Sequence, residues 1–418
     1  DDTKAFIAGT YRIGFGQRLT FDNTDQKDPD GFYGDFDVFR DNDLSRECRE
    51  SRGELDESPC SGVAGDIYVT PDYRSRDGLL GAAASIREIK IGGGEASVHA
   101  FGSYQPRSIY QYELYNKDIC DDPTNDQDPN CSAPDVFRTG SDPLAPAAEF
   151  SFQTLPNVFA EIIGGGHVDY SMGRRTRVGV TGYGSKVDFL VNGMNLDFQE
   201  WSRMPYGGNF GAVGVDVAHG IGNTDILAEV SRSFDNTPGS GGGLGAVVRT
   251  VTAWDKKELE VSARYYDTNF QNPHARPIAA ADQFDGLRAR DEAGARVRYT
   301  ADLSKRLKLR SSLDYWRAMT DGTDEIVAFV RGDMDLSDQI RVGMWTQYQD
   351  KDLSDSVEID GMPADMPCFE VSVEDDENGE PVPCTGEKLQ LTGRVRLAPT
   401  KATWIDLQYQ HEFQDDPR

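Results

Sequence analysis

Five of the six aspartates in the segment DNTDQKDPDGFYGDFD could together hold a hard cation. Ca²⁺ takes carboxylate oxygens as ligands, and the short spacing of these aspartates can bring several of them around one ion. Gly31 and Gly34 allow the tight turns that such a loop needs. The pattern predicts a calcium site, with a solvated acidic loop that holds no dedicated ion as the alternative. The predicted ligands are Asp25, Asp28, Asp30, Asp35 and Asp37.

Six cysteines occur in three pairs, and each pair lies in an acidic segment of the chain. The pairs are Cys48 and Cys60, Cys120 and Cys131, and Cys368 and Cys384. Each pair closes a short loop far in sequence from the others, so three local disulfides are the favoured pairing. Disulfides indicate an oxidising compartment. The alternatives are reduced cysteines in a cytosolic protein or a zinc site, although zinc sites usually bring closer cysteine spacing or nearby histidines.

Three acidic segments carry almost all of the net charge of −28. Residues 22–66, 118–142 and 352–387 have net charges of −9, −6 and −12, so the rest of the chain is close to neutral. A soluble protein with an even acidic coat would not concentrate its charge in this way. These segments would repel phosphates, and we therefore expect no nucleic acid partner for the chain.

The segments between these loops alternate apolar and polar residues, which is the period of a β-strand with two different faces. In 307–316, for example, Leu309 and Leu313 share one face, while Arg310 and Asp314 share the other. About fifteen strands can be recognised in this way, from 4–20 to 402–413. The same alternation occurs in 259–266, 295–303, 340–349, 389–397 and 403–413.

Short turns alternate with long loops along the chain, which is typical of bacterial outer-membrane barrels with one rim of each kind. The short turns are 92–95, 173–175, 219–223, 254–257, 303–306, 336–339 and 398–401. The long loops are 22–77, 105–163, 189–207, 269–291 and 352–386.

We therefore predict an all-β fold, a transmembrane antiparallel up-and-down β-barrel of about 16 strands, with 1–418 as one domain in a Gram-negative outer membrane. The long loops would be extracellular and the short turns periplasmic. Barrels normally have an even number of strands, so one strand is either unrecognised or lies beyond Arg418. The mean hydropathy of −0.57 excludes a helical membrane protein, and a soluble β-protein is the alternative.

The polar face of the strands would line the lumen of such a barrel. It forms either a charged channel with basic and acidic ladders, or a lumen filled by salt bridges and a plug. Segment 105–163 is long enough to supply the plug, and the run Gly164, Gly165 and Gly166 is predicted to bend the chain as it enters the wall. The predicted lumen-lining residues are Arg264, Arg296, Arg298, Arg310, Asp314, Arg341, Arg394, Arg396, Asp406 and Glu412.

The leading functional hypothesis is a porin-like channel for small polar solutes or ions. The alternatives are a plugged barrel that acts as a surface scaffold, and an outer-membrane component of a DNA or protein translocation machine. The sequence has no HExxH, GxSxG or Walker pattern, and we expect no enzyme. Expected partners are the lipid bilayer, lipopolysaccharide bridged to the acidic loops by divalent cations, and other outer-membrane or surface proteins.

Four strings of residues resemble a group of bacterial outer-membrane barrels. They are YRIGFGQRL at 11–19, RSRDGLLGAAAS at 74–85, FRTGSDPLAPAAEF with EIIGGGHVDY at 137–170, and YYDTNFQNPHARP with DEAG at 265–294. In that group the barrel often follows periplasmic helix-hairpin-helix modules of a competence-protein type. The resemblance implies the barrel fold and the outer membrane. This chain shows no helix-hairpin-helix module, so DNA handling is not implied.

The first acidic loop also resembles the calcium-binding repeats of thrombospondin type 3, which run roughly N-x-D-Q-x-D-x-D-x-D-G-x-G-D. One acidic position of that pattern is absent from this chain. The resemblance implies calcium as the bound ion. A shorter acidic string, CDDPTNDQDPNC, lies between Cys120 and Cys131.

Overall fold

The structure is a computed structural model that describes ten long stretches of the chain and several short ones. The long stretches are 3–24, 26–35, 78–109, 155–189, 205–237, 241–282, 289–320, 322–350, 387–400 and 403–414. The short ones are 115–116, 136–137, 149–150, 194–195, 239, 286–287, 353, 358–359 and 362–363.

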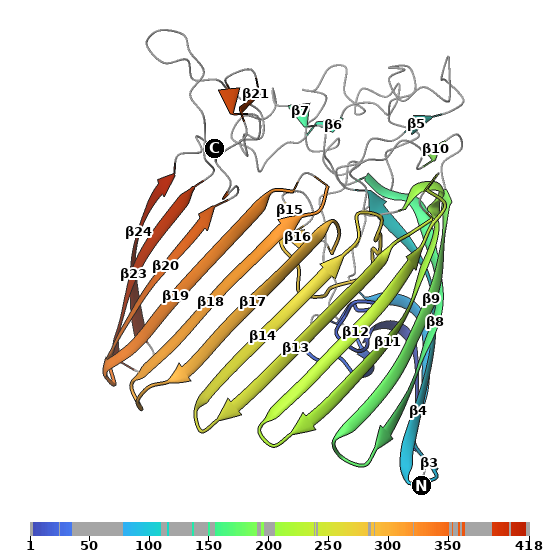
Figure 1. Cartoon of the computed structure of the whole chain (residues 1–418), viewed down its shortest axis with the longest axis horizontal. Coiled ribbons are helices and arrows are strands. Elements are labelled where there is room, and N and C mark those ends of the chain that lie inside the picture. Colours follow the sequence, from blue (N-terminus) through green and yellow to red (C-terminus); the bar gives the residue numbers. More distant parts are fainter. Residues whose placement is uncertain are drawn as a thin grey trace. The chain divides into compact units, whose positions relative to one another are not determined.

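The fold is all-β, and its main element is one antiparallel, up-and-down sheet of 16 strands (Figure 1). After β2 and β1 the order in the sheet follows the chain. The strands are β2 (Gly31–Gly34), β1 (Thr3–Gly14), β3 (Leu79–Ile91), β4 (Gly94–Ile109), β8 (Leu155–Met172), β9 (Thr176–Phe189), β11 (Asn209–Ile221), β12 (Thr224–Phe234), β13 (Leu244–Trp254), β14 (Lys257–Tyr266), β17 (Glu292–Asp302), β18 (Leu307–Ala318), β19 (Asp324–Ser337), β20 (Ile340–Asp350), β23 (Lys388–Thr400) and β24 (Thr403–Gln414).

Eight two-residue strands form four separate pairs. They are β5 (Tyr115–Asn116) with β10 (Met194–Asn195), β6 (Val136–Phe137) with β7 (Glu149–Phe150), β15 (Ala281–Asp282) with β16 (Gly286–Leu287), and β21 (Glu358–Ile359) with β22 (Met362–Pro363). A 3-10 turn, η3 (Tyr206–Gly208), precedes β11. Among the described residues, no helix has the length and apolar character needed to cross a membrane.

The predicted fold class is confirmed, and one strand boundary is corrected. The first strand was expected over 4–20 but ends at Gly14, after which the chain turns. The sixteenth strand is β2, which lies inside the first predicted long loop and pairs with Tyr11–Gly14 of β1. The sequence hid this strand because four residues flanked by aspartates are too short to show a period.

The predicted short turns join consecutive strands of the sheet, as Figure 1 shows. The tightest leave only two residues between strands. Asp255, for example, follows Trp254 at the end of β13 and has a φ of 53°. Primed hairpin turns require this left-handed conformation, because their twist matches that of the flanking strands.

The chain divides into two compact units. Unit 1 contains residues 1–217, 229–246 and 269–290. Unit 2 contains residues 218–228, 247–268 and 291–418. The prediction of a single domain over 1–418 concerns both units together and stays a prediction.

In unit 1 the two faces of the sheet have reversed exposure compared with a water-soluble protein. On β9, Val180 is 48% exposed while Thr181 is 2% exposed. On the neighbouring strand β8, Val168 is exposed while His167 is buried. The apolar face is thus open to the surroundings, and the polar face is covered by other parts of the same unit.

The three glycines at 164–166 lie in the middle of β8, so the predicted bend at the entry to a strand is wrong. A Cβ atom on Gly165 would lie 2.5 Å from Cζ of Phe101 and 2.7 Å from Cβ of Tyr183. The glycine therefore makes room for two aromatic rings that project from the neighbouring strands β4 and β9.

The predicted plug, 105–163, is partly sheet. β4 extends to Ile109 and β8 begins at Leu155, and Gln105 pairs with Glu161 across the two strands. Most of the segment between them lies outside the described residues, so its predicted role as a plug stays a prediction.

Candidate functional site

In unit 1 a different segment covers the polar face of the sheet. We call residues 11–35, of which Asp25 is not described, the inward segment. Five of its large apolar side chains are buried, and Phe21, for example, packs against the rings of Phe101 and Tyr183, which project from the polar face. The five are Tyr11, Ile13, Phe15, Leu19 and Phe21, each exposed by 1% or less.

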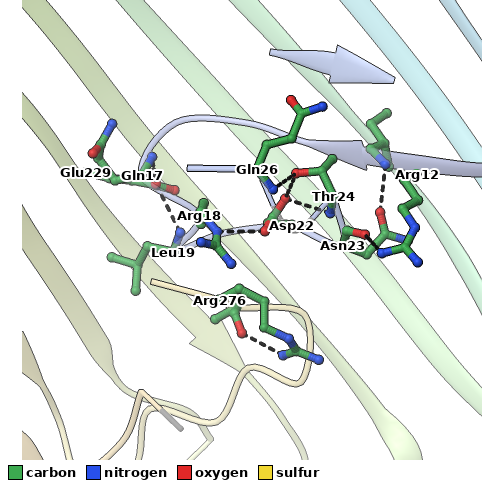
Figure 2. Close-up of polar contacts among 12 residues, drawn as sticks. Arg12, Gln17, Arg18, Leu19, Asp22, Asn23, Thr24, Gln26, Glu229 and Arg276 are labelled. Carbon is green, nitrogen blue, oxygen red and sulfur yellow. Dashed lines mark hydrogen bonds and ion pairs between the residues drawn. The ribbon is translucent and has the colours of Figure 1, made fainter. Parts of the chain in front are cut away.

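The carboxylate of Glu229 on β12 anchors the turn at Gln17–Thr20 (Figure 2). Its Oε2 accepts hydrogen bonds from the backbone N–H groups of Gln17 at 2.6 Å and Leu19 at 3.1 Å. Its Oε1 accepts from the backbone N–H of Thr20 at 2.8 Å and from the Thr20 hydroxyl at 2.6 Å. Because Glu229 is buried, these donors satisfy a carboxylate that would otherwise be costly to bury.

Gly16 lets the turn approach this carboxylate. It has a φ of 59°, which L side chains rarely adopt, and a Cβ atom there would lie 2.7 Å from Oε2 of Glu229. The conformation of residues 16–20 therefore depends on Glu229 of β12, although the sequence separates Gln17 from Glu229 by 212 positions.

The loop after β14 holds the other side of the inward segment. Nδ2 of Asn272 donates to the backbone carbonyls of Leu19 at 3.0 Å and Thr20 at 2.9 Å. Its Oδ1 accepts from the hydroxyl of Tyr183 at 2.6 Å and from the backbone N–H of His274. One amide side chain thus joins the inward segment, the loop and β9.

His274 continues this connection to β8. Its backbone carbonyl accepts from the N–H of Asp22 at 2.8 Å, and its Nε2 lies 2.6 Å from Oε1 of Glu161. The backbone N–H of Arg276 donates to the carbonyl of Arg18 at 2.7 Å. Residues from 11–19, 161–170 and 265–277, which the sequence only showed as separate strings, therefore meet in one buried network.

Two histidines of the polar face flank Phe15. The ring of Phe15 stacks on His167 with centroids 4.1 Å apart and lies edge-on to His99 at 5.2 Å. Nδ1 of His167 is 2.8 Å from the Thr181 hydroxyl. Neither ring nitrogen of His99 has a hydrogen-bond partner within the described part of the chain. His99 on β4 and His167 on β8 are thus brought against the inward segment.

Arginines accompany two of the five aspartates predicted to bind calcium. Asp35 pairs with Arg12 at 3.0 Å, and Asp30 lies 3.0 Å from Arg177 and 3.8 Å from Arg87. Across the described stretches, no group of three side chains is arranged to hold a metal ion. Asp25 and Asp37 lie outside these stretches, so the calcium site stays a prediction.

The predicted disulfides cannot be placed in the same way. All of their cysteines lie outside the described residues and their pairing stays a prediction. They are Cys48, Cys60, Cys120, Cys131, Cys368 and Cys384.

In unit 2 the strand registers place the predicted lumen-lining residues on one face. Directly opposed residues of antiparallel strands project to the same side. Arg296 opposes Asp314, and Arg396 opposes both Arg341 and Asp406. We call this side the charged face of unit 2. That it lines a lumen stays a prediction.

One part of the charged face is balanced by ion pairs. Arg264 pairs with Glu292 and, at 2.5 Å, with Asp314. Glu260 lies 4.0 Å from Arg296 and 3.8 Å from Arg298. Here the acidic and basic side chains neutralise one another.

A second part of the charged face lines a partly open cavity of about 250 Å³, and most of the lining is basic. Five of its lining residues are absent from the predicted lumen-lining set: Lys308, Gly343 and, on β19, Arg331, Asp333 and Asp335. The three residues on β19 could have been found from the sequence. The signal was present, because these residues occupy alternate positions of β19. The cavity is lined by Lys308, Arg310, Arg331, Asp333, Asp335, Arg341, Gly343, Arg394 and Arg396.

Comparison with known proteins gives only distant similarity. No protein-family profile and no curated protein matches the chain. The chain is similar to the outer membrane channel DcaP of Acinetobacter baumannii, with 10% identity, a TM-score of 0.31, and coverage of 99% of this chain and 97% of that one. A structure from work on in-meso crystallisation of membrane proteins has 9% identity, a TM-score of 0.22, and coverage of 61% and 83%. Likeness at this level does not transfer a function.

Proposed function

We propose that this chain is an outer-membrane channel, a porin-like conduit for small polar solutes or ions. The observation that carries the proposal is the reversed exposure of the two sheet faces. In unit 2, Leu313, Val330 and Met344 are exposed by 46%, 46% and 67% on one face. Their sequence neighbours Asp314 and Arg331 belong to the charged face.

A continuous exposed apolar face is unfavourable in water, where each large apolar side chain forgoes roughly 1.5–3 kcal/mol of burial. The same face is favourable against lipid hydrocarbon, and strands can cross a bilayer when their backbone groups pair with neighbouring strands. The opposite face carries arginines and aspartates that need water. Lipid on one side and water on the other are the surroundings of a channel wall.

The proposal is tested by recording from the purified protein in a planar lipid bilayer. We expect extraction from membranes to require detergent, and inserted protein to give steady, stepwise currents. Recovery of folded protein from cells without detergent would contradict the membrane assignment. Insertion without current would contradict the conduit.

A plugged barrel that acts as a surface scaffold is the second candidate. It is favoured by the inward segment, which covers the polar face of unit 1 through buried contacts such as that of Glu229. This candidate predicts protein that inserts but stays silent in the bilayer. Roles in adhesion or translocation, and binding of lipopolysaccharide through divalent cations, belong to this alternative and remain predictions.

A further inference from the structure

The basic cavity on the charged face of unit 2 has an arrangement of charges that fold stability does not explain. Arg310 on β18 is directly opposite Arg331 on β19, and Arg341 on β20 is directly opposite Arg396 on β23. Like charges placed directly opposite each other destabilise a sheet. Two such pairs on neighbouring strands indicate that something other than stability maintains them.

The carboxylates near the cavity do not cancel this charge. Asp333 accepts two hydrogen bonds from Arg331, at 2.7 and 2.8 Å. Asp335 accepts from Arg341 at 2.6 Å, and Asp406 is shared between two arginines at 2.8 and 2.9 Å. Asp302 lies 4.0 Å from Lys308. Four carboxylates thus face six basic side chains, which leaves an excess of positive charge. The six are Lys308, Arg310, Arg331, Arg341, Arg394 and Arg396. We call these six residues the basic cluster.

Two members of the basic cluster are placed to receive a ligand. Arg310 has no ion pair or hydrogen bond within the described residues, although it lines the cavity. Arg331 lies over the ring of Trp345, with its guanidinium carbon 4.6 Å from the ring centroid. Stacking of this kind holds a guanidinium in one orientation. Because Nε and Nη2 of Arg331 donate to Asp333, Nη1 is the nitrogen that is left to donate to a ligand.

The chemistry of the basic cluster selects oxyanions. Five of its six members are arginines, whose planar forks donate paired hydrogen bonds to phosphate or carboxylate groups. A halide ion offers a single acceptor atom, whereas a phosphate or carboxylate group offers two oxygens whose spacing matches the two donors. An anion with several negative charges gains from several arginines at once, and the cavity has room for a small one.

We propose that the basic cluster is a binding site for small, multiply charged oxyanions, and that it makes the channel favour anions. This inference rests on the proposed function, because it assigns a substrate class to the same charged face. The site differs from the balanced region around Arg264, where one arginine meets two carboxylates.

The test compares single-charge variants with inorganic pyrophosphate as the probe. We expect pyrophosphate to reduce the KCl current of the wild-type channel, and Arg396→Gln to raise the concentration for half-block at least tenfold. Lys388→Gln is the matched control, because it removes one positive charge from the same face of β23 at a residue paired with Glu412. The pyrophosphate concentration that gives half-block of the Lys388→Gln channel should stay within about twofold of the wild-type value.

Arg310→Gln is the second variant, and it leaves no carboxylate without a partner. Isothermal titration calorimetry of pyrophosphate with detergent-solubilised protein measures binding independently of channel conductance. Protein that binds pyrophosphate but carries no current contradicts the proposed function and leaves the site intact. A conducting channel in which both arginine variants bind and block like wild type overturns the site.

Discussion

The polar faces of the two units follow the same alternation but have different surroundings. In unit 1 the inward segment and the loop at 269–276 cover the polar face, and backbone N–H groups satisfy its carboxylate Glu229. In unit 2 the charged face carries side chains that pair across strands or line a cavity, as Asp406 and Arg310 do. Alternation therefore creates a polar face, and the connecting segments decide whether that face is closed or open.

The two kinds of carboxylate have different consequences when removed. Glu229 is buried and accepts hydrogen bonds from the backbone of buried residues, so its loss leaves these donors without partners. Asp406 is exposed and holds two arginines that water can solvate. The first residue should govern stability, and the second should govern the electric field along the face.

The largest expected effect is that of Glu229→Ala. The variant should lose roughly 3 kcal/mol or more of unfolding free energy, since each buried donor left without a partner costs roughly 1–3 kcal/mol. Urea unfolding of vesicle-inserted protein would measure the loss. Trypsin should cut the variant after Arg18, because the turn that contains this residue is no longer held by Glu229. Glu412→Ala is the matched change on the charged face and should leave the urea midpoint unchanged. Equal losses of stability in the two variants would contradict the view that carboxylates in unit 1 stabilise the fold more than those in unit 2.

A smaller effect is expected from Asn272→Asp. An ionised carboxylate cannot donate to the carbonyls of Leu19 and Thr20, so the variant should lose about 2 kcal/mol, the value of roughly two hydrogen bonds. Asn236→Asp makes the same change in an exposed loop and should be neutral. If Asn272→Asp unfolds at the wild-type urea concentration, the loop does not hold the inward segment.

The glycines of β8 allow a test of how tightly the aromatic rings of Phe101 and Tyr183 pack against this strand. Gly165→Ala should lose roughly 1–2 kcal/mol, because its Cβ atom would meet Phe101 and Tyr183 and force them to move. Gly164→Ala is its neighbour and has nothing within 4 Å of the added atom. The two alanines should therefore differ in thermal unfolding temperature, and identical temperatures would mean that the rings are not tightly packed.

The smallest expected effect on stability is that of Asp406→Asn in unit 2. It removes the carboxylate shared by Arg394 and Arg396 and so adds positive charge beside the basic cluster. We expect an unchanged urea midpoint and a higher anion-to-cation permeability ratio, measured as the reversal potential in a KCl gradient. A fall in that ratio would contradict the assignment of this face to anions.

Local patterns in the sequence predicted most strands of the 16-stranded sheet and the short turns between them. Strands such as 307–318 and 340–350 show their period over ten or more residues, and tight turns such as that at Asp255 separate them. The charged face of unit 2 followed from the same alternation. These features could be predicted because they depend on residues that are neighbours in sequence or in adjacent strands.

The inward segment could not be predicted, because its contacts join distant parts of the chain. YRIGFGQRL appears as a strand that continues to residue 20, but the chain turns after Gly14 and the carboxylate of Glu229 holds this turn in place. Nothing near Glu229 in sequence marks it as an anchor. The opposed arginines were equally hidden, since Arg310 and Arg331 face each other only once the register of β18 and β19 is known.

The anchoring of the inward segment has a consequence for the order of folding. Its hydrogen bonds join residues 212 and 253 positions apart, from Gln17 to Glu229 and from Leu19 to Asn272. Contacts over such separations form late, because a long stretch of chain must be closed first. The inward segment can therefore dock only after β12 and the loop after β14 have formed. Until then its aromatic side chains are open to chaperones and proteases.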